Sequence, residues 1–235
     1  MKIVWNEQSV RWFHNASEYT RYHENLAKIL LEHIPCRETL CDMGCGAGMI
    51  DFELAPYIGQ ITCVDISQEA VQSVAETAKQ RGIHNITAVC ADGGSMKQQW
   101  DTVIALYHGG TDAISTYFPM VKDRLILVTH GEALGNFGPK GHKVRKCFDS
   151  MGFKERMDEL GVQYELKYTA LEYGQPFQDR SEAEAFVTAY TMPMGSEDME
   201  KYLEAHLVET GDEKYPLYIP NQKKMGIFII RRDEN

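Results

Sequence analysis

The sequence predicts an α/β fold built on a mostly parallel β-sheet, and two observations carry this prediction. Short apolar runs alternate with helix-like segments along the chain, which is the pattern of right-handed βαβ units with helices on both faces of a sheet. The first apolar run leads directly into Gly-Cys-Gly-Ala-Gly at residues 44–48. Three glycines so close together indicate a tight strand-to-helix turn that lets a ligand approach the backbone.

The chain shows no internal repeat, low-complexity tract or linker, so we expect a single domain over residues 1–235. Tyr19, Tyr22 and Leu26 recur at helical spacing within residues 15–33, which predicts one helix there, ended by Pro35. Residues 1–35 are therefore expected to form a helical cap. The strand candidates that follow this cap are 39–43, 60–65, 86–90, 101–106 and 124–129.

A helix is expected between the second and third of these strands, with Ser67 as its N-cap and Gly82 as its stop. Two further strand candidates, 164–174 and 226–232, alternate apolar and polar residues, as expected near a sheet edge or in an antiparallel pair. The segment 174–222 contains helix-like stretches around a Met-Pro-Met break, and we expect it to be a lid inserted in the domain.

Composition and charge limit the classes of partner. The chain carries 34 acidic and 24 basic side chains, for a net charge of −10, so we expect it to repel the phosphates of nucleic acids. A basic cluster at residues 140–146 is the exception, and it is also typical of a solvated helix face. No apolar run approaches the ~18 residues of a membrane span, and the first residues lack a signal-peptide pattern. We expect a cytoplasmic protein with reduced cysteines and no membrane partner.

Polar residues follow the strands at the carboxyl ends, where ligands sit in an open α/β sheet. Asp65 ends the second strand, 21 residues after Gly44, and its carboxylate can accept two hydrogen bonds from a ribose diol. Ile66 is suited to pack on an adenine face. Asp92 can accept a hydrogen bond from an exocyclic amine, and Gly93 allows close backbone approach. Together these residues describe a site for an adenosine-containing ligand.

The glycine spacing discriminates between a dinucleotide and a smaller nucleoside. A dinucleotide fingerprint is GxGxxG, whereas this chain has GxGxG with Asp42 before it. A carboxylate at the turn repels a pyrophosphate but attracts a cationic amino-acid group. S-adenosylmethionine carries an ammonium and a sulfonium on an adenosine, so it suits this site, and a dinucleotide-dependent oxidoreductase is disfavoured.

The stretches LCDMGCGAG, VDIS, CADGG and GIFIIRR resemble the class I S-adenosylmethionine-dependent methyltransferases. The resemblance implies a three-layer Rossmann-like sandwich with a seven-stranded sheet of order 3-2-1-4-5-7-6, in which strand 7 is antiparallel. It also implies that Gly44, Cys45 and Gly46 lie along the methionine portion with Asp42 nearby. The residues we expect to bind the cofactor are Tyr19, Tyr22, Asp42, Gly44, Cys45, Gly46, Gly48, Asp65, Ile66, Asp92, Gly93 and Tyr107.

Two histidines end the fourth and fifth strands, beside the expected methyl group. His108 is the candidate general base, and His108 and His130 are the candidate substrate contacts. The alternative for each is a structural or cofactor-contacting histidine. The glycine-rich run 131–142 is either a mobile active-site loop or a surface connection. No metal site is expected.

We therefore predict a methyltransferase that uses S-adenosylmethionine and a small-molecule acceptor. The alternatives are methylation of a protein or an RNA, and a non-catalytic protein that binds S-adenosylmethionine. Base methylation is disfavoured because ALYHGG follows the fourth strand in place of an N/D-P-P-Y motif. Arsenic methylation is disfavoured because Cys41, Cys63 and Cys90 lie inside strands, where cysteine is a common small hydrophobe.

Overall fold

The computed structural model describes residues 7–131, 150–191 and 193–232, and the chain divides into two compact units. The described residues of the first unit, unit 1, are 7–22 and 170–224 without residue 192. Those of the second unit, unit 2, are 23–131, 150–169 and 225–232. The strands β6 and β10 each contribute residues to both units. The division into one domain with a cap (1–35) and a lid (174–222) stays a prediction.

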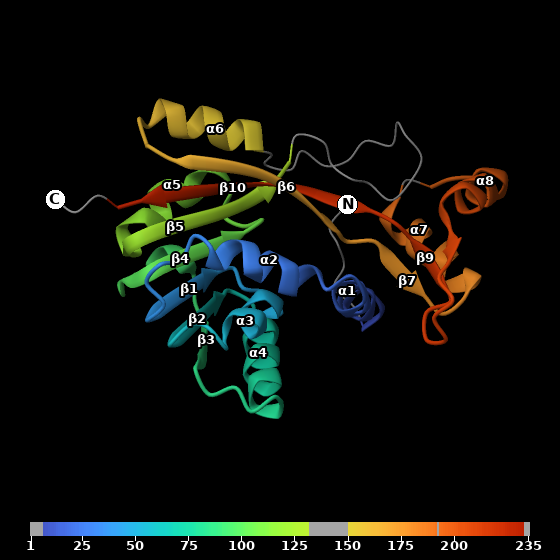
Figure 1. The fold of residues 1–235 in the computed structure, drawn as a ribbon, viewed down its shortest axis with the longest axis horizontal. Coiled ribbons are helices and arrows are strands. Elements are labelled where there is room, and N and C mark those ends of the chain that lie inside the picture. The colour runs from blue at the N-terminus through green and yellow to red at the C-terminus, as the bar shows by residue number, and fades with distance from the viewer. Residues whose placement is uncertain (1–6, 132–149, 192, 233–235) are drawn as a thin grey trace. The chain divides into compact units, whose positions relative to one another are not determined.

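The main sheet has seven strands in the order β3-β2-β1-β4-β5-β10-β6 (Figure 1). Its strands are β1 (Thr39–Met43), β2 (Gln60–Asp65), β3 (Ile86–Cys90), β4 (Trp100–Leu106), β5 (Val121–His130), β6 (Glu165–Glu172) and β10 (Gln222–Arg231). The pairs among β1 to β5 are parallel, and β10 runs antiparallel to β5. β10 is the seventh strand of this sheet in chain order. The predicted fold class and strand order are therefore confirmed.

The strands of the antiparallel pair, β5 and β10, are longer than the sequence predicts. β10 begins at Gln222, four residues before the predicted start at Gly226, and β5 begins at Val121. The two strands pair continuously from Met225 opposite His130 to Arg231 opposite Arg124. Backbone pairing of this kind extends a strand beyond its apolar run, because the hydrogen bonds do not depend on the side chains.

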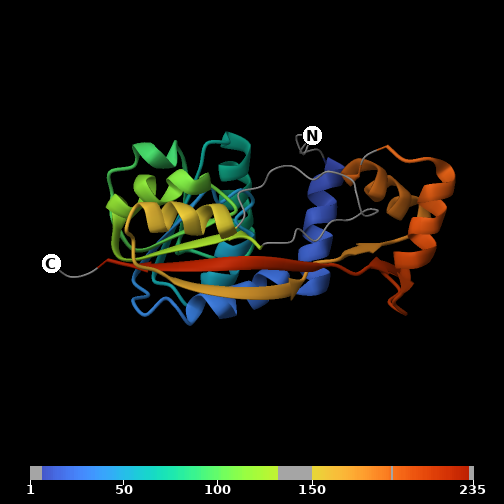
Figure 2. The ribbon, with the colours of Figure 1, turned by 90° about the horizontal axis from the view of Figure 1, so that it is seen from above.

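Unit 2 contains the helices that cover this sheet. They are α2 (Tyr22–Leu31), of which Tyr22 belongs to unit 1, α3 (Met49–Leu54), α4 (Gln68–Gln80), α5 (Ala113–Tyr117) and α6 (Ser150–Glu159), with short 3₁₀ turns η1 (Gly93–Ser95), η2 (Gly110–Asp112) and η3 (Phe118–Met120). Ser67 caps α4 as predicted, since its hydroxyl accepts a hydrogen bond from Ala70 N at 3.2 Å. Figure 2 shows α6 beside β10, where the rings of Phe153 and Phe228 lie 5.9 Å apart in the same apolar core as α5.

The N-terminal helical pattern is two helices rather than one. The prediction of a single helix within residues 15–33 is wrong, because α1 (Glu7–Thr20) ends before Arg21 and α2 starts at Tyr22. Arg21 has a positive φ of 53°, which breaks the helical path. Neither glycine nor proline marks this break, so the helical periodicity continues across it in the sequence.

Unit 1 combines α1 with elements from the 170–224 segment. These elements are β7 (Gln175–Phe177), α7 (Arg180–Tyr190), α8 (Ser196–His206), β8 (Val208–Glu209) and β9 (Leu217–Ile219). The three strands form a small sheet of order β7-β9-β8, which was not expected from the sequence. The two helices on either side of the Met-Pro-Met break are found as predicted. The core of unit 1 brings Trp12 against Phe186, with ring centroids 5.2 Å apart.

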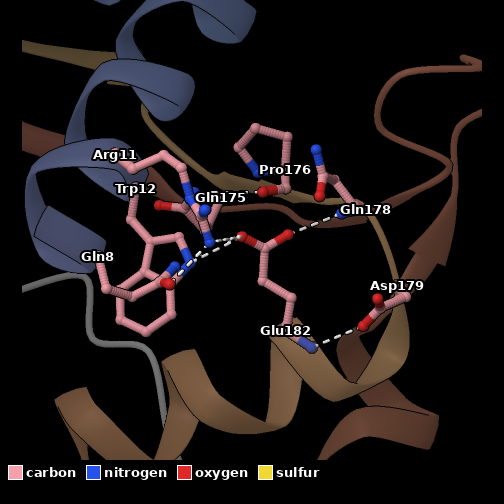
Figure 3. A network of polar contacts seen from close by, with 8 residues as sticks. All are labelled: Gln8, Arg11, Trp12, Gln175, Pro176, Gln178, Asp179 and Glu182. Carbon is pink, nitrogen blue, oxygen red and sulfur yellow. Dashed lines mark hydrogen bonds and ion pairs between the residues drawn. The ribbon is translucent and has the colours of Figure 1, made fainter.

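A buried carboxylate fastens α1 to α7 within unit 1 (Figure 3). The Glu182 side chain is 10% exposed and accepts hydrogen bonds from Trp12 Nε1 at 3.1 Å and from Gln178 N at 2.8 Å. Asp179 caps the same helix by accepting a bond from Glu182 N at 2.8 Å. This reciprocal arrangement is a variant of the capping box, which satisfies backbone donors that a helix start leaves open.

Candidate functional site

The glycine turn, residues 44–48, connects β1 to α3 and has the geometry that the sequence predicts. Gly44, Gly46 and Gly48 have φ values of 77°, 55° and 68°, in the left-handed region that is cheap only for glycine. Gly44 N donates to Val64 O at 2.8 Å, which fastens the turn to β2. A Cβ atom built on Gly46 would meet nothing within 4 Å. The backbone at Gly46 is thus open to a ligand.

Asp65 lies at the end of β2 and holds this turn in place. Its Oδ2 accepts a hydrogen bond from Gly46 N at 2.9 Å, and its Oδ1 accepts one from Ser67 N at 2.9 Å. Each carboxylate oxygen has a second lone pair, so both can still accept a bond from a ligand hydroxyl. Ile66 beside it is 76% exposed, which leaves an apolar face bare next to the carboxylate.

Asp92 and Gly93 follow β3, at the end of the neighbouring strand. Asp92 Oδ1 accepts a bond from Gly94 N at 3.0 Å and thereby starts the turn η1. A Cβ on Gly93 would lie 3.1 Å from Met43 Sδ and 3.3 Å from the Tyr117 ring, so the backbone packs closely there. Tyr117 is buried, and burial followed by the nearby Asp92 charge raises the pKa of its hydroxyl.

His108 lies directly over the glycine turn. A Cβ added to Gly44 would be 2.3 Å from the His108 ring, so only glycine leaves room for this imidazole. The ring is exposed and is stacked with that of Tyr117, at 6.4 Å between centroids and 13° between planes. The structure thus brings together His108 and Gly44, two predicted site residues that are 64 positions apart in the sequence.

Tyr107 and His130 form a second predicted pair that the structure brings together. Their rings lie 4.6 Å apart, at the ends of the neighbouring strands β4 and β5. Tyr107 has a positive φ of 56°, which is costly for a bulky residue and is the kind of backbone strain that collects at functional sites. Its hydroxyl donates to Met225 Sδ at 3.8 Å on β10.

Two acidic groups are buried beneath the turn. Asp42 on β1 is 2% exposed, and Asp51 on α3 is 0% exposed. Burial and the repulsion from Asp51 raise the pKa of Asp42 well above its ordinary range. Burial is also the main reason why the pKa of Asp51 is raised to about 8. Within the described residues, the groups buried beneath the turn are therefore carboxylic acids and not basic side chains.

The other predicted residues lie as follows. Cys45 and Gly48 are part of the glycine turn, with Gly48 packed on Val74 of α4. Tyr19 and Tyr22 belong to unit 1, where Tyr19 lies 5.0 Å from Tyr218 between ring centroids and Tyr22 lies 4.5 Å from Tyr173. Their assignment to the cofactor stays a prediction. The basic cluster 140–146, and the run 131–142 apart from its first residue, lie outside the described residues.

Sequence reasoning missed two residues of this site. Asp51 shares the buried face of α3 with Ile50 and Leu54, and a lone acid on such an apolar face was a signal that could have been used. Tyr117 touches the positions of Gly93, His108 and Gly109, but it lies inside a helix. A search limited to the residues at strand ends therefore does not find Tyr117.

The described residues hold one candidate group of metal ligands and no membrane-spanning helix. There, the one group of potential ligands that meet within 4.8 Å is Cys36, Glu38 and Asp101, and Asp101 already binds Thr39 N at 3.0 Å. None of the helices within those residues is both long and apolar enough to cross a membrane. The five cysteines that the structure describes are free thiols, with Cys41 and Cys63 buried and Cys90 exposed.

Comparison with known proteins matches residues 40–123 to the family described as "Methyltransferase domain". No curated protein matches the chain. Among solved structures, the YcgJ protein from Bacillus subtilis is 14% identical with a TM-score of 0.57, and the match covers 90% of this chain and all of that one. A putative methyltransferase from Bacillus halodurans is 12% identical with a TM-score of 0.55, covering 89% and 99% of the two chains.

A further similar structure is an S-adenosylmethionine-dependent methyltransferase from Aquifex aeolicus, 11% identical with a TM-score of 0.51, covering 93% of this chain and all of that one. At these identities the likeness concerns the fold. The domain match itself spans the glycine turn, Asp65, Asp92 and His108. Residues 40–123 are thus matched as a methyltransferase domain, and the seven-stranded order of the sheet is the one that the resemblance to the class I S-adenosylmethionine-dependent methyltransferases implies.

Proposed function

We propose that this methyltransferase binds S-adenosylmethionine at the carboxyl ends of β1 to β4 and transfers the methyl group to a small-molecule acceptor. The observation that carries the proposal is the glycine turn. Its backbone is open at Gly46, is bonded to Asp65 and has the acid Asp42 beneath it. Open backbone beside acid suits a cationic amino-acid group and disfavours a pyrophosphate.

The described residues fit the nucleoside part of this cofactor as well. The free lone pairs of Asp65 can accept bonds from the two ribose hydroxyls, and the exposed side chain of Ile66 offers an apolar face to adenine. Asp92 uses one carboxylate oxygen for Gly94 N, so its second oxygen can accept a bond from the adenine amine.

When bound, S-adenosylmethionine supplies a methyl group on a sulfonium that is already activated for in-line displacement. The protein therefore has to align the acceptor and exclude water, which can contribute about 7–11 kcal/mol to the lowering of the barrier. His108 lies over Gly44, at the end of β4, and is our candidate for the group that takes a proton from an acceptor.

A small acceptor is supported by the charge of the chain. At a net charge of −10, the protein repels polyanions over many contacts, whereas a small molecule makes few of them. The decisive experiment is transfer of a labelled methyl group from S-adenosylmethionine into a cell extract separated into metabolites, proteins and nucleic acids. We expect label in the metabolites. Label confined to the protein or RNA fraction would overturn the acceptor class, and no transfer to any fraction would favour a binding protein.

Cofactor choice is tested separately by calorimetric titration. We expect micromolar binding of S-adenosylhomocysteine and far weaker binding of NAD. A tighter NAD complex would overturn the cofactor assignment.

The role of His108 is tested by His108→Ala. If His108 is the base, turnover should fall by about 10²–10⁴ and the acidic limb of the pH–rate profile should change, because a base acts only when it is unprotonated. A smaller loss that does not depend on pH would restrict His108 to shaping the site.

A further inference from the structure

The phenol ring of Tyr117, on α5, lies between the segments that follow β3 and β4. A Cβ built on Gly93, after β3, would be 3.3 Å from Cε1 and 3.6 Å from the hydroxyl oxygen of this ring. A Cβ built on Gly109, after β4, would be 3.1 Å from Cε2 and 3.3 Å from the same oxygen. The hydroxyl group therefore lies between the backbones of two strand ends. Each of these glycines follows a predicted site residue in the chain, Asp92 and His108.

The packing around this ring fixes where its hydroxyl group lies. Tyr117 is 4% exposed and belongs to the apolar core of unit 2, together with Met43 of β1 and Ala113 of α5. Its ring is stacked with that of His108, at 13° between the planes. A Cβ on Gly109 would also meet Ala113 Cβ at 2.9 Å, so glycine leaves this space to the ring. A ring packed in this way has little freedom to move its hydroxyl group elsewhere.

The hydroxyl group of Tyr117 makes no hydrogen bond within the described residues, and it is not among the polar atoms that are sealed from solvent. Buried tyrosine hydroxyls usually have a hydrogen-bond partner. Burial, and then the charge of Asp92, raise the pKa of this hydroxyl, so at neutral pH it keeps its proton and can donate. A donor is thus held between two strand ends, where the described part of the chain supplies no acceptor for it.

We propose that the Tyr117 hydroxyl donates a hydrogen bond to a ring nitrogen of the cofactor's adenine and is a specificity-determining residue beside Asp92. This inference rests on the proposed function, because it adds a second polar contact to the base that we assign to Asp92. Adenine donates through its exocyclic amine and accepts through ring nitrogens. The carboxylate of Asp92 can serve only the amine. A site that recognises adenine by both kinds of group needs a donor as well, and Tyr117 supplies one.

Tyr117→Phe separates this role from a structural one. The substitution keeps the ring and its contacts with Gly93, Gly109 and His108, and it removes only the hydroxyl oxygen. Because that oxygen has no hydrogen bond to lose within the described residues, we expect the melting temperature of the ligand-free protein to stay the same or rise. Affinity for S-adenosylhomocysteine should nevertheless fall by about three- to tenfold, as for the loss of one neutral hydrogen bond.

The test is calorimetric titration of the full chain with S-adenosylhomocysteine and with its 1-deaza, 3-deaza and 7-deaza analogues, each of which has C–H in place of one ring nitrogen. We expect the wild type to bind one of these analogues about three- to tenfold more weakly than S-adenosylhomocysteine. Tyr117→Phe should bind that analogue and S-adenosylhomocysteine with equal affinity, because the hydrogen bond is already absent. Tyr57→Phe removes the hydroxyl of an exposed tyrosine in the same unit and is the matched control, which should behave as the wild type.

The possible outcomes separate the inference from the proposed function. If Tyr117→Phe weakens S-adenosylhomocysteine and every analogue by the same factor, or weakens none of them, the hydroxyl contacts no ring nitrogen and the inference alone is overturned. A lower melting temperature of ligand-free Tyr117→Phe would likewise overturn it, by assigning the hydroxyl to the stability of the fold. A wild type that binds neither S-adenosylhomocysteine nor any analogue would overturn the proposed function together with the inference.

Discussion

Asp65 performs two tasks with one carboxylate. Its oxygens accept hydrogen bonds from the backbone of the glycine turn at Gly46 and of the α4 start at Ser67, and each retains a second lone pair. The residue that we assign to the ribose therefore also shapes the turn that we assign to the methionine portion. A substitution at Asp65 should consequently affect both cofactor binding and stability.

We expect Asp65→Ala to weaken binding of S-adenosylhomocysteine by about 10- to 100-fold, since two hydrogen bonds to the ligand are lost. The melting temperature should also fall, because Gly46 N and Ser67 N lose their acceptor. Glu69→Gln is the control, since it changes a nearby exposed acid whose carboxylate accepts a hydrogen bond from the Ser67 hydroxyl. Unchanged affinity in a folded Asp65→Ala protein would remove Asp65 from the ribose.

Asp51 should make the stability of the protein depend on pH. Its pKa is raised from 3.8 to about 8 in the folded state, so the folded protein binds the proton more tightly than the unfolded chain. The stabilisation is fully present below about pH 4 and is lost as the pH rises through about 8. Relative to Asp51→Asn, the free energy of unfolding should fall by up to about 1.4 kcal/mol per pH unit within that range. Urea unfolding at several pH values measures this, and parallel profiles would contradict it.

In the glycine turn, both the left-handed backbone and the open space beside Gly46 are required by the proposed cofactor site. Gly46 and Gly82 both have positive φ, at 55° and 67°, and a Cβ on either would meet nothing within 4 Å. They differ in place, since Gly82 follows α4 and Gly46 lies where we assign the cofactor.

Valine at either position should therefore cause a similar loss of stability, on the order of 1–2 kcal/mol, from the strained backbone. Only Gly46→Val should abolish binding of S-adenosylhomocysteine, because its side chain occupies the open space above the turn. Thermal unfolding and calorimetry on both variants test this pair. A Gly46→Val protein that binds normally would mean that the ligand lies elsewhere.

Glu182 should stabilise the start of α7 as a capping residue stabilises a helix. Glu182→Ala removes the acceptor for Trp12 Nε1 and Gln178 N, so we expect a loss of about 1–3 kcal/mol in the free energy of unfolding. Glu184→Ala, on the same helix, breaks only an exposed contact to Arg180 and should cost less than about 1 kcal/mol. Equal losses, measured by denaturant unfolding, would show that the buried network contributes nothing beyond a surface pair.

At the scale of the whole molecule, the residues that we assign to the cofactor fall mainly in unit 2, and the chain as a whole is acidic. The net charge of −10 should prevent retention of RNA even at about 0.05 M salt, where electrostatic binding is favoured. Gel retardation with single-stranded and structured RNA measures this. Specific retention that disappears on neutralising the basic cluster 140–146 would instead support a nucleic-acid acceptor.

The sequence by itself determined the class of fold and the bounds of β1 to β4. The apolar runs of β1 to β4 match the observed strands to within one residue. Three of them, β1, β2 and β4, are largely buried, and strands buried on both faces carry an unbroken apolar signal. The glycine turn and Asp65 were also predictable, since left-handed backbone requires glycine and a carboxyl strand end is where ligands meet an open sheet.

Tertiary structure decided what depends on distant partners. The break at Arg21 leaves no signal in the periodicity of α1 and α2, and the strands of the small sheet are too short for an alternating pattern. His108 comes to lie on Gly44, and Asp51 beside Asp42, only because β4 and α3 pack against β1. The burial that raises the pKa of both acids is likewise a property of the packed core, because each carboxyl group loses water to neighbours that the local sequence does not specify.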